Sequence, residues 1–257
     1  MALNPKLTDW RGKRVWLIGA STGIGAALAR SLAARGVRLV LSARGIDRLS
    51  ALVADLQGAT ALPLDVSDAS AMLPAAQDAA RLLGGLDVVI FNAGTYQPLR
   101  AWELKPESIR ATLNVNLLGV MDGVAAVLPD MLAAGQGHLV IVGSVAGYRG
   151  LPKAAVYGPS KAALINFAES IYMDLAPRGI GVTLVNPGFV ATPLTAQNDF
   201  KMPALISADE AACEILAGLA RGRFEIHFPR RFSYFLKLLR LLPARAYFAL
   251  VSRTAQS

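Results

Sequence analysis

A tyrosine and a lysine four residues apart carry the clearest chemical signal in the sequence. Tyr157 and Lys161 would lie one helical turn apart on the same face, so both can act on one ligand. A free tyrosine titrates near pH ~10, and a neighbouring ammonium lowers the pKa of the phenol towards the range of a general base. Ser144 follows an apolar run, and its hydroxyl could hold a substrate oxygen. The three residue types predict proton transfer at a carbonyl or hydroxyl group.

A glycine-rich turn near the start of the chain predicts a phosphate site. Gly19-Ala20-Ser21-Thr22-Gly23-Ile24-Gly25 follows an apolar run and opens an Ala/Leu-rich helix, so backbone amides and the helix N-terminus can approach a pyrophosphate. Asn92-Ala93-Gly94 would bring a second backbone segment over a flat ligand, and Asp65 could accept a hydrogen bond from an adenine amino group. The alternative is a tight turn that binds nothing.

The residues after the second apolar run bear on the choice of dinucleotide. A carboxylate there pairs with the ribose 2′-OH of NAD, whereas a cation accommodates the 2′-phosphate of NADP. The segment is Ser42-Ala43-Arg44, with no acid, so a hydroxyl and a guanidinium predict NADP(H) in preference to NAD(H). The alternative is that Arg44 is a solvated loop residue.

Apolar runs and helical patterns alternate along the chain and must position these groups. Such alternation predicts a three-layer α/β fold of the Rossmann type, with a doubly wound parallel sheet whose carboxyl edge carries the ligand site. The expected strands are 14–20, 37–42, 60–64, 86–91, 138–142 and 181–186; the expected helices are 26–35, 48–56, 106–134, 156–176 and a capped helix from Ser207 towards Gly222.

Composition excludes several other classes. The chain has 257 residues, 54% hydrophobic and 17% charged, which suits one large globular domain and not a disordered chain. Cys213, expected in the core, and two scattered histidines predict no disulfide and no metal site. The N-terminus lacks a signal-peptide pattern and no uncharged apolar run reaches ~18 residues, so we expect a cytoplasmic protein that does not span a membrane.

The net charge of +8 is concentrated at one end. From Gly222 onwards there are seven basic residues and one acid, Glu225, so the preceding 221 residues carry only +2. A nearly neutral body does not favour a nucleic-acid partner.

Together, the motifs resemble those of the classical short-chain dehydrogenases/reductases. The order and spacing of six motifs carry the resemblance, over roughly residues 12–220: Gly19-x-x-x-Gly23-x-Gly25, Asn92-Ala93-Gly94, Asn114-Val115-Asn116, Ser144, Tyr157-x-x-x-Lys161 and Pro187-Gly188. Two positions depart from the family pattern, because Ile18 stands where a threonine is usual and Phe91 where an asparagine is usual. Both departures raise doubt about the local packing at these strand ends more than about the chemistry of the site.

The resemblance implies hydride transfer between nicotinamide and a carbonyl or alcohol carbon. Tyr157 would be the general acid or base, Ser144 would orient the substrate oxygen, Lys161 would bind the nicotinamide ribose and lower the pKa of Tyr157, and Asn116 would hold a relay water. Thr192 would contact the carboxamide. The remaining implied cofactor contacts are Ser21, Thr22, Ile24, Val66, Pro187, Gly188 and Val190.

The C-terminal part is less typical of the family. Residues 193–206 correspond to the family's substrate loop, and Phe200, Met202 and Leu205 suggest a lipophilic substrate, although they could equally pack the loop on the core. Residues 230–242 form a basic amphipathic pattern, with Phe232, Phe235, Leu236, Leu238, Leu239 and Leu242 on one arc and Arg230, Lys237 and Arg240 opposite. Contact with a membrane through 230–251 and packing on a subunit both remain open.

We therefore expect a Rossmann-type domain over 1–221 with a substrate lid at 193–206, followed by a basic amphipathic extension over 222–257. The expected function is NADP(H)-dependent reduction or oxidation of a lipophilic carbonyl or secondary alcohol. The alternative is a non-catalytic NADP(H)-binding sensor or scaffold. We expect a homo-oligomer, a dimer or a tetramer, the dimer forming through the helices that carry Asn116 and Tyr157.

Overall fold

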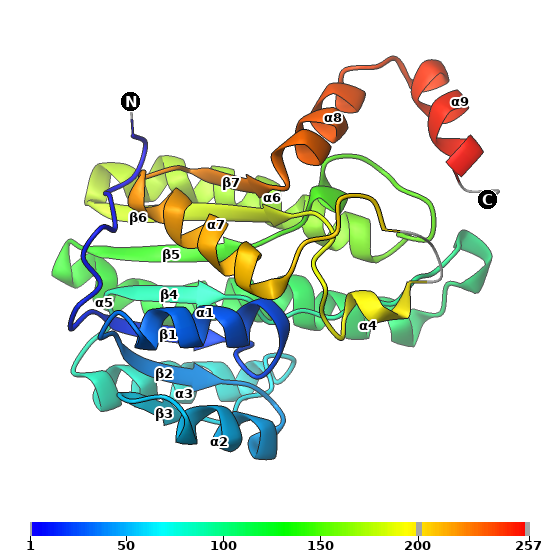
Figure 1. Ribbon diagram of the computed structural model, residues 1–257. Coiled ribbons are helices and arrows are strands. Elements are labelled where there is room, and N and C mark those ends of the chain that lie inside the picture. Colours follow the sequence, from blue (N-terminus) through cyan, green and yellow to red (C-terminus); the bar gives the residue numbers. More distant parts are fainter. Residues whose placement is uncertain (1, 199–201, 255–257) are drawn as a thin grey trace.

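The computed structural model describes residues 2–198 and 202–254 and has a parallel sheet at its centre (Figure 1). The strand order is β3-β2-β1-β4-β5-β6-β7, with all neighbours parallel. The strands are β1 (Arg14–Ile18), β2 (Arg38–Ser42), β3 (Ala59–Ala61), β4 (Val88–Phe91), β5 (Gly137–Val142), β6 (Ile180–Pro187) and β7 (Glu225–Phe228). The order reverses between β1 and β4, which confirms the doubly wound Rossmann-type fold and places a ligand crevice at that switch point.

Helices cover both faces of the sheet and make the fold three-layered (Figure 1). One face carries α1 (Gly23–Ala33), α2 (Ile46–Ala54) and α7 (Ala208–Ala220); the other carries α3 (Ala69–Leu83), α5 (Gly119–Ala134) and α6 (Tyr157–Leu175), with α4 (Pro106–Leu113) leading into α5. The predicted cap of α7 is present, since the Glu210 amide donates to Ser207 Oγ at 3.1 Å and the Glu210 carboxylate accepts from the Ser207 amide at 2.7 Å.

Two apolar cores lie on the two faces of the sheet. Successive residues of a strand point to opposite faces, so Val15 and Leu17 join one core and Trp16 and Ile18 the other. Because both faces are covered, the central strands are apolar along their whole length. This is the physical reason that continuous apolar runs located them.

The continuous helical stretch 106–134 is long and apolar enough to cross a membrane by length and composition. It also carries charged residues, among them Asp122 and Asp130, and its Val120, Val124 and Met131 side chains are buried in the core. These contacts are those of a core helix packed on a sheet.

The structure corrects two details of the sequence interpretation. β7 is the seventh strand of the sheet, pairing with β6 from Glu225 to Phe228, so a domain boundary at residue 221 falls inside the α/β unit. Cys213 is exposed rather than in the core, because α7 turns Ala212, Ile215 and Leu216 towards the sheet.

Two helices follow β7 and stand at one corner of the molecule (Figure 1). They are α8 (Arg230–Arg240) and α9 (Ala244–Thr254), separated at Pro243 as the sequence predicts. The predicted apolar arc of α8 is divided between two environments. Leu239 is buried and Phe232 and Leu236 pack against the core, whereas Phe235 and Leu238 are exposed.

Candidate active site

The predicted site residues gather at the carboxyl edge of the sheet, beginning with the glycine turn between β1 and α1. Gly19 has a φ of +86°, and its amide donates to the Ser42 carbonyl at 2.7 Å. A Cβ at Gly19 would lie 2.4 Å from the Ala93 amide nitrogen, so only glycine permits this approach of two backbones. Ser21, Thr22 and Ile24 lie in the same turn, and Thr22 is the residue that precedes α1.

Asn92 fixes the glycine turn to the end of β4. Its Nδ2 donates to the Gly19 carbonyl at 2.7 Å, and a Cβ at Gly25 would lie 2.0 Å from that carbonyl oxygen. Gly94 follows as an exposed residue, where a Cβ would fill space 3.6 Å from Asn116 Oδ1 and 3.7 Å from Lys161 Nζ. The glycine turn, the Asn92-Ala93-Gly94 segment and the α6 lysine therefore border one region.

The segment after β6 reaches the same turn. A Cβ at Gly23 would lie 2.8 Å from Thr192 Cγ2, which brings Thr192 over the start of α1. Gly188, which follows Pro187, donates its amide hydrogen to the Phe228 carbonyl at 2.7 Å. Val190 forms an isolated β-bridge with Ile206, the last residue of the predicted lid. Asp199, Phe200 and Lys201 of that lid lie outside the described residues.

At the end of β2 the structure agrees only in part with the prediction that Ser42 and Arg44 meet a phosphate. The pKa of Asp65 lies below its usual range, chiefly because the carboxylate accepts two hydrogen bonds from Ser67. Arg44 is exposed, and its positive charge lowers the pKa of Asp65 by a smaller amount. Ser42, by contrast, is fully buried, and its Oγ accepts the indole N–H of Trp16 at 2.9 Å. The prediction that the Ser42 hydroxyl meets a phosphate is wrong, because this side chain faces the core.

Val66 follows Asp65 in the chain and belongs to one of the two cores. It is buried, and its carbonyl oxygen would lie 2.5 Å from a Cβ at Gly119. Ile18 and Phe91, the two departures from the family pattern, are also buried at strand ends, and the Phe91 ring fills the space over Gly123. Both act as packing residues, as expected.

Tyr157 begins α6, and its phenol is hydrogen-bonded to Ser144, which is 8% exposed at the end of β5. Burial raises the pKa of Tyr157 to about 12; the bond to Ser144 acts in the opposite direction but is the smaller effect. Ser144 Oγ accepts the Ala146 amide at 3.1 Å and donates to the Pro187 carbonyl at 3.5 Å. These contacts fix the serine between β5 and β6.

Lys161 lies one turn further along α6 and is 4% exposed. Its Nζ donates to the Val142 carbonyl at 2.9 Å and lies 5.8 Å from the centre of the Tyr157 ring. Burial lowers the pKa of Lys161 to about 8. The expected lowering of the Tyr157 pKa by this ammonium is not found, because burial of the phenol dominates and the ammonium points at a backbone carbonyl.

Asn116 lies in a π-helical turn, Asn114–Leu118, between α4 and α5. Its Oδ1 accepts the Thr95 amide at 2.7 Å, and its Nδ2 donates to the Thr95 carbonyl at 2.9 Å and to Ser160 Oγ at 3.1 Å. Ser160 in turn donates to the Tyr157 carbonyl at 2.7 Å. π-helical turns are frequent at functional sites, and this one connects the loop after β4 to α6.

The sequence interpretation missed Tyr96. Its ring packs edge-on against Tyr157 with centroids 4.9 Å apart, and its hydroxyl donates to Asn198 Oδ1 at 3.0 Å. Tyr96 thus connects Tyr157 to the predicted lid. A lone tyrosine two residues after Asn92-Ala93-Gly94 carries no distinguishing pattern, so only the geometry reveals it.

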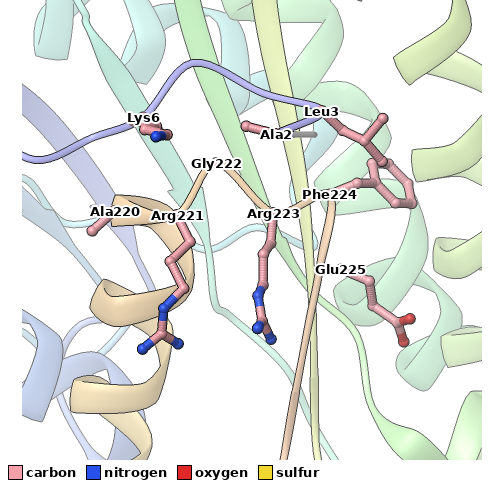
Figure 2. Close-up of a pocket in the computed structure, with 9 residues that line it drawn as sticks. All are labelled: Ala2, Leu3, Lys6, Ala220, Arg221, Gly222, Arg223, Phe224 and Glu225. Atoms are coloured by element: carbon pink, nitrogen blue, oxygen red, sulfur yellow. The ribbon is translucent and has the colours of Figure 1, made fainter.

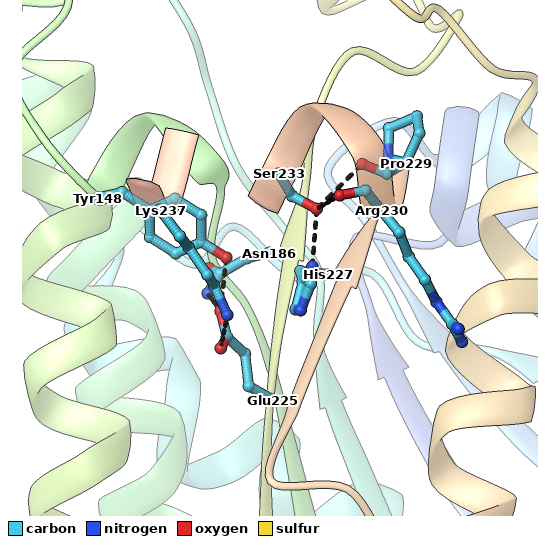
Figure 3. A network of polar contacts seen from close by, with 8 residues as sticks. All are labelled: Tyr148, Asn186, Glu225, His227, Pro229, Arg230, Ser233 and Lys237. Atoms are coloured by element: carbon cyan, nitrogen blue, oxygen red, sulfur yellow. Dashed lines mark hydrogen bonds and ion pairs between the residues drawn. The ribbon is translucent and has the colours of Figure 1, made fainter. Parts of the chain in front are cut away.

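A polar network behind the site was also missed (Figure 3). The Glu225 carboxylate accepts hydrogen bonds from the Tyr148 hydroxyl at 2.5 Å and from Asn186 Nδ2 at 2.9 Å, and it pairs with the Lys237 ammonium at 2.5 Å. Beside it, His227 Nδ1 bonds to Ser233 Oγ at 2.7 Å. The network joins α8 to the segments that hold Ser144 and Pro187.

A cavity of about 640 Å³ lies at the opposite edge of the sheet, near the start of β7 (Figure 2). Figure 2 shows that the backbones of the N-terminal segment and of the turn after α7 border it. Its lining residues are Ala2, Leu3, Lys6, Ala220, Arg221, Gly222, Arg223, Phe224 and Glu225. None of the predicted catalytic or cofactor residues lines this cavity.

The fold and this edge define a dinucleotide-binding α/β protein with a serine, tyrosine and lysine brought together beside the glycine turn. Residues 13–202 match the short chain dehydrogenase family, and the chain belongs to that family.

Individual relatives agree with this assignment. An uncharacterized oxidoreductase of Myxococcus xanthus (strain DK1622) is 40% identical over 229 residues, which cover 88% of this chain and 90% of that protein. The 2-dehydro-3-deoxy-L-rhamnonate dehydrogenase (NAD(+)) of Sphingomonas sp. (strain SKA58) is 33% identical, covering 73% and 76%. A Burkholderia phymatum short chain dehydrogenase/reductase solved in complex with NAD has a TM-score of 0.82 at 26% identity, covering 90% and 94%. The protein is therefore an oxidoreductase of this family, with a nicotinamide cofactor.

Proposed function

We propose that the protein is an NADP(H)-dependent reductase of lipophilic carbonyl compounds. The observation that carries the proposal is the juxtaposition of Ser144, Tyr157 and Lys161 at the sheet edge where the glycine turn lies. The exposed Gly94, bare of a side chain beside Asn116 and Lys161, leaves room for a flat ligand at the same place. These features fit a dinucleotide, which would supply or accept the hydride.

The chain's own residues would bind the dinucleotide and protonate the substrate oxygen. Backbone amides at Gly23 and Gly25, with the N-terminus of α1, would hold the pyrophosphate, and Lys161 and Thr192 would hold the nicotinamide half. Ser144 would donate a hydrogen bond to the substrate oxygen. Because burial raises the pKa of Tyr157 to about 12, the phenol carries its proton at neutral pH and suits the general acid of a reduction.

The cofactor preference rests on Arg44. The guanidinium is exposed after β2, within electrostatic reach of Asp65, and no carboxylate occupies Ser42-Ala43-Arg44. An exposed guanidinium suits a 2′-phosphate, whereas the ribose 2′-OH of NAD would find no acid there. One relative is named as an NAD(+) dehydrogenase and one structural neighbour was solved with NAD, which makes the preference for NADP(H) the point to test.

Exposed apolar side chains on the loop after β4 and on the lid support a lipophilic substrate. In the loop after β4, Trp102 is 78% exposed and Leu104 is also exposed, and Leu205 of the lid is exposed as well. Tyr96 and Asn198 connect these two segments. We further propose a dimer through α5 and α6, because Met121 and Leu132 on α5 and Met173 on α6 are exposed. The cytoplasm, where we place the protein, supplies NADPH as a reductant.

The test of cofactor choice is a titration of the native chain, Arg44→Asp and Arg38→Asp with NADPH and NADH. Arg38 is an exposed arginine at the other end of β2 and serves as the matched control. Loss of a charge-assisted contact costs about 1.5–3 kcal/mol, so Arg44→Asp should lower the NADPH/NADH affinity ratio by tenfold or more. An unchanged ratio in Arg44→Asp, or an equal fall in both variants, contradicts the assignment.

A further inference from the structure

Although Tyr234 packs edge-on against His227 and Phe248 against Tyr247, the outer side of α8 and α9 is an exposed apolar surface. We call it the tail surface; its exposed side chains are Tyr234, Phe235, Leu238, Leu241, Phe248 and Leu250. Leu241 is 79% exposed and Leu238 62%. Tyr234, Leu238 and Leu241 follow one another at spacings of four and three residues, so they form one stripe along α8.

Specific contacts hold the other side of these helices to the body. Arg149 Nη1 donates to the carbonyls of Leu239 and Leu242, both at 2.8 Å, and its guanidinium lies 3.8 Å from the centre of the Tyr247 ring. Tyr247 donates to the Gly150 carbonyl at 2.6 Å. Lys237, which the sequence places opposite the apolar arc, pairs with the partly buried Glu225. The tail surface therefore faces outwards because the inward side is already occupied.

Charge indicates what covers this surface. The sequence has no acid after Glu225, and Arg231 and Arg245 are exposed on the same two helices as these apolar side chains. In a two-fold dimer the same patch would face itself, which would bring like charges together. An occupant must be apolar and anionic at once, and an anionic lipid surface has both properties.

We propose that the tail surface docks the protein on an anionic lipid bilayer. The apolar side chains enter the headgroup region, and the arginines contact lipid phosphate and carboxylate groups. α8 begins at the carboxyl edge of the sheet, and Phe232 packs against Phe189, 5.6 Å between ring centres, beside Gly188. Docking thus places the active-site edge near the bilayer. Access of a lipophilic substrate from that bilayer rests on the proposed function, whereas docking itself does not.

The test is co-sedimentation of the full chain with vesicles of phosphatidylcholine, with and without phosphatidylserine. Native protein should sediment with the phosphatidylserine vesicles and be released by salt. Leu238→Ser/Leu241→Ser should weaken binding by at least about tenfold, because two large apolar side chains no longer enter the interface. Arg245→Gln should weaken it about fivefold.

The matched control is Leu73→Ser/Leu82→Ser, two exposed leucines on α3, which should bind as the native chain does. Far-UV circular dichroism shows that each variant is folded without relying on cofactor binding, so failure of the docking proposal is distinguishable from failure of the proposed function. Three results would overturn the proposal. The first is that the native chain does not sediment with the phosphatidylserine vesicles. The second is that Leu238→Ser/Leu241→Ser binds these vesicles as well as Leu73→Ser/Leu82→Ser does. The third is that the native chain forms an oligomer in sedimentation velocity and that Leu238→Ser/Leu241→Ser dissociates it.

Discussion

The buried ammonium of Lys161 predicts an alkaline limit to cofactor binding. Burial lowers its pKa from 10.5 to about 8, a penalty of about 3 kcal/mol on the charged form. In the ligand-free protein half of the lysines are then neutral near pH 8 and about nine-tenths near pH 9. If the ammonium binds the nicotinamide ribose, the cofactor must first restore that proton.

The perturbation is Lys161→Arg, and the assay is NADPH affinity as a function of pH, measured by the fluorescence of the bound cofactor. For the native chain the Kd should rise about tenfold per pH unit above about 8, since one proton is taken up on binding. Arginine keeps its charge throughout, so the variant should lose this dependence even if its affinity at neutral pH is lower. A native Kd that is constant to about pH 10, or the same rise in the variant, would refute the reasoning.

Two further predictions concern the glycine turn and a buried histidine. Gly25→Ala places a methyl group 2.0 Å from the Gly19 carbonyl oxygen, so NADPH affinity should fall at least tenfold by titration, whereas Gly45→Ala, in open space, should leave it unchanged. His138 on β5 has its pKa lowered from 6.5 to about 4 by burial. The unfolded chain therefore binds a proton first as the pH falls. The free energy of unfolding should drop by about 3 kcal/mol between about pH 6.5 and about pH 4 from this group. His138→Gln should flatten that part of the urea-denaturation profile; an unchanged slope would show that other groups set it.

Much of the fold follows from the sequence because parallel strands covered on both faces must be apolar throughout. Strand β7 was not predicted because it lacks such a continuous apolar run. It is a short edge strand, Glu225–Phe228, in which polar residues alternate with apolar ones, and it takes its place by pairing with Leu184–Pro187. Four residues are too few for this alternation to identify a strand, and the pairing partner is distant in the sequence.

The site residues followed from the sequence where a backbone requirement fixed the residue type. Gly19 and Gly25 are such positions, because any side chain there would collide with a neighbouring segment. Ser42 shows the limit of this reasoning, since a position after a strand does not state which way the side chain points. It shares a face with Val40, two residues earlier, and that face packs on Trp16. Tyr96 needed the three-dimensional contact with Tyr157 to be found.

The measurement that tests the central claim most directly is NADPH oxidation by the native chain and by Tyr157→Phe, against aldehydes and ketones of increasing chain length. Tyr172→Phe is the control, because within the described part of the chain that hydroxyl donates to the Leu3 carbonyl and touches none of the predicted site residues. We predict turnover that rises with chain length in the native chain and the control, and is lost in Tyr157→Phe while NADPH still binds. Turnover retained in Tyr157→Phe would contradict the assigned proton donor, and tight NADPH binding without turnover in the native chain would contradict the enzyme.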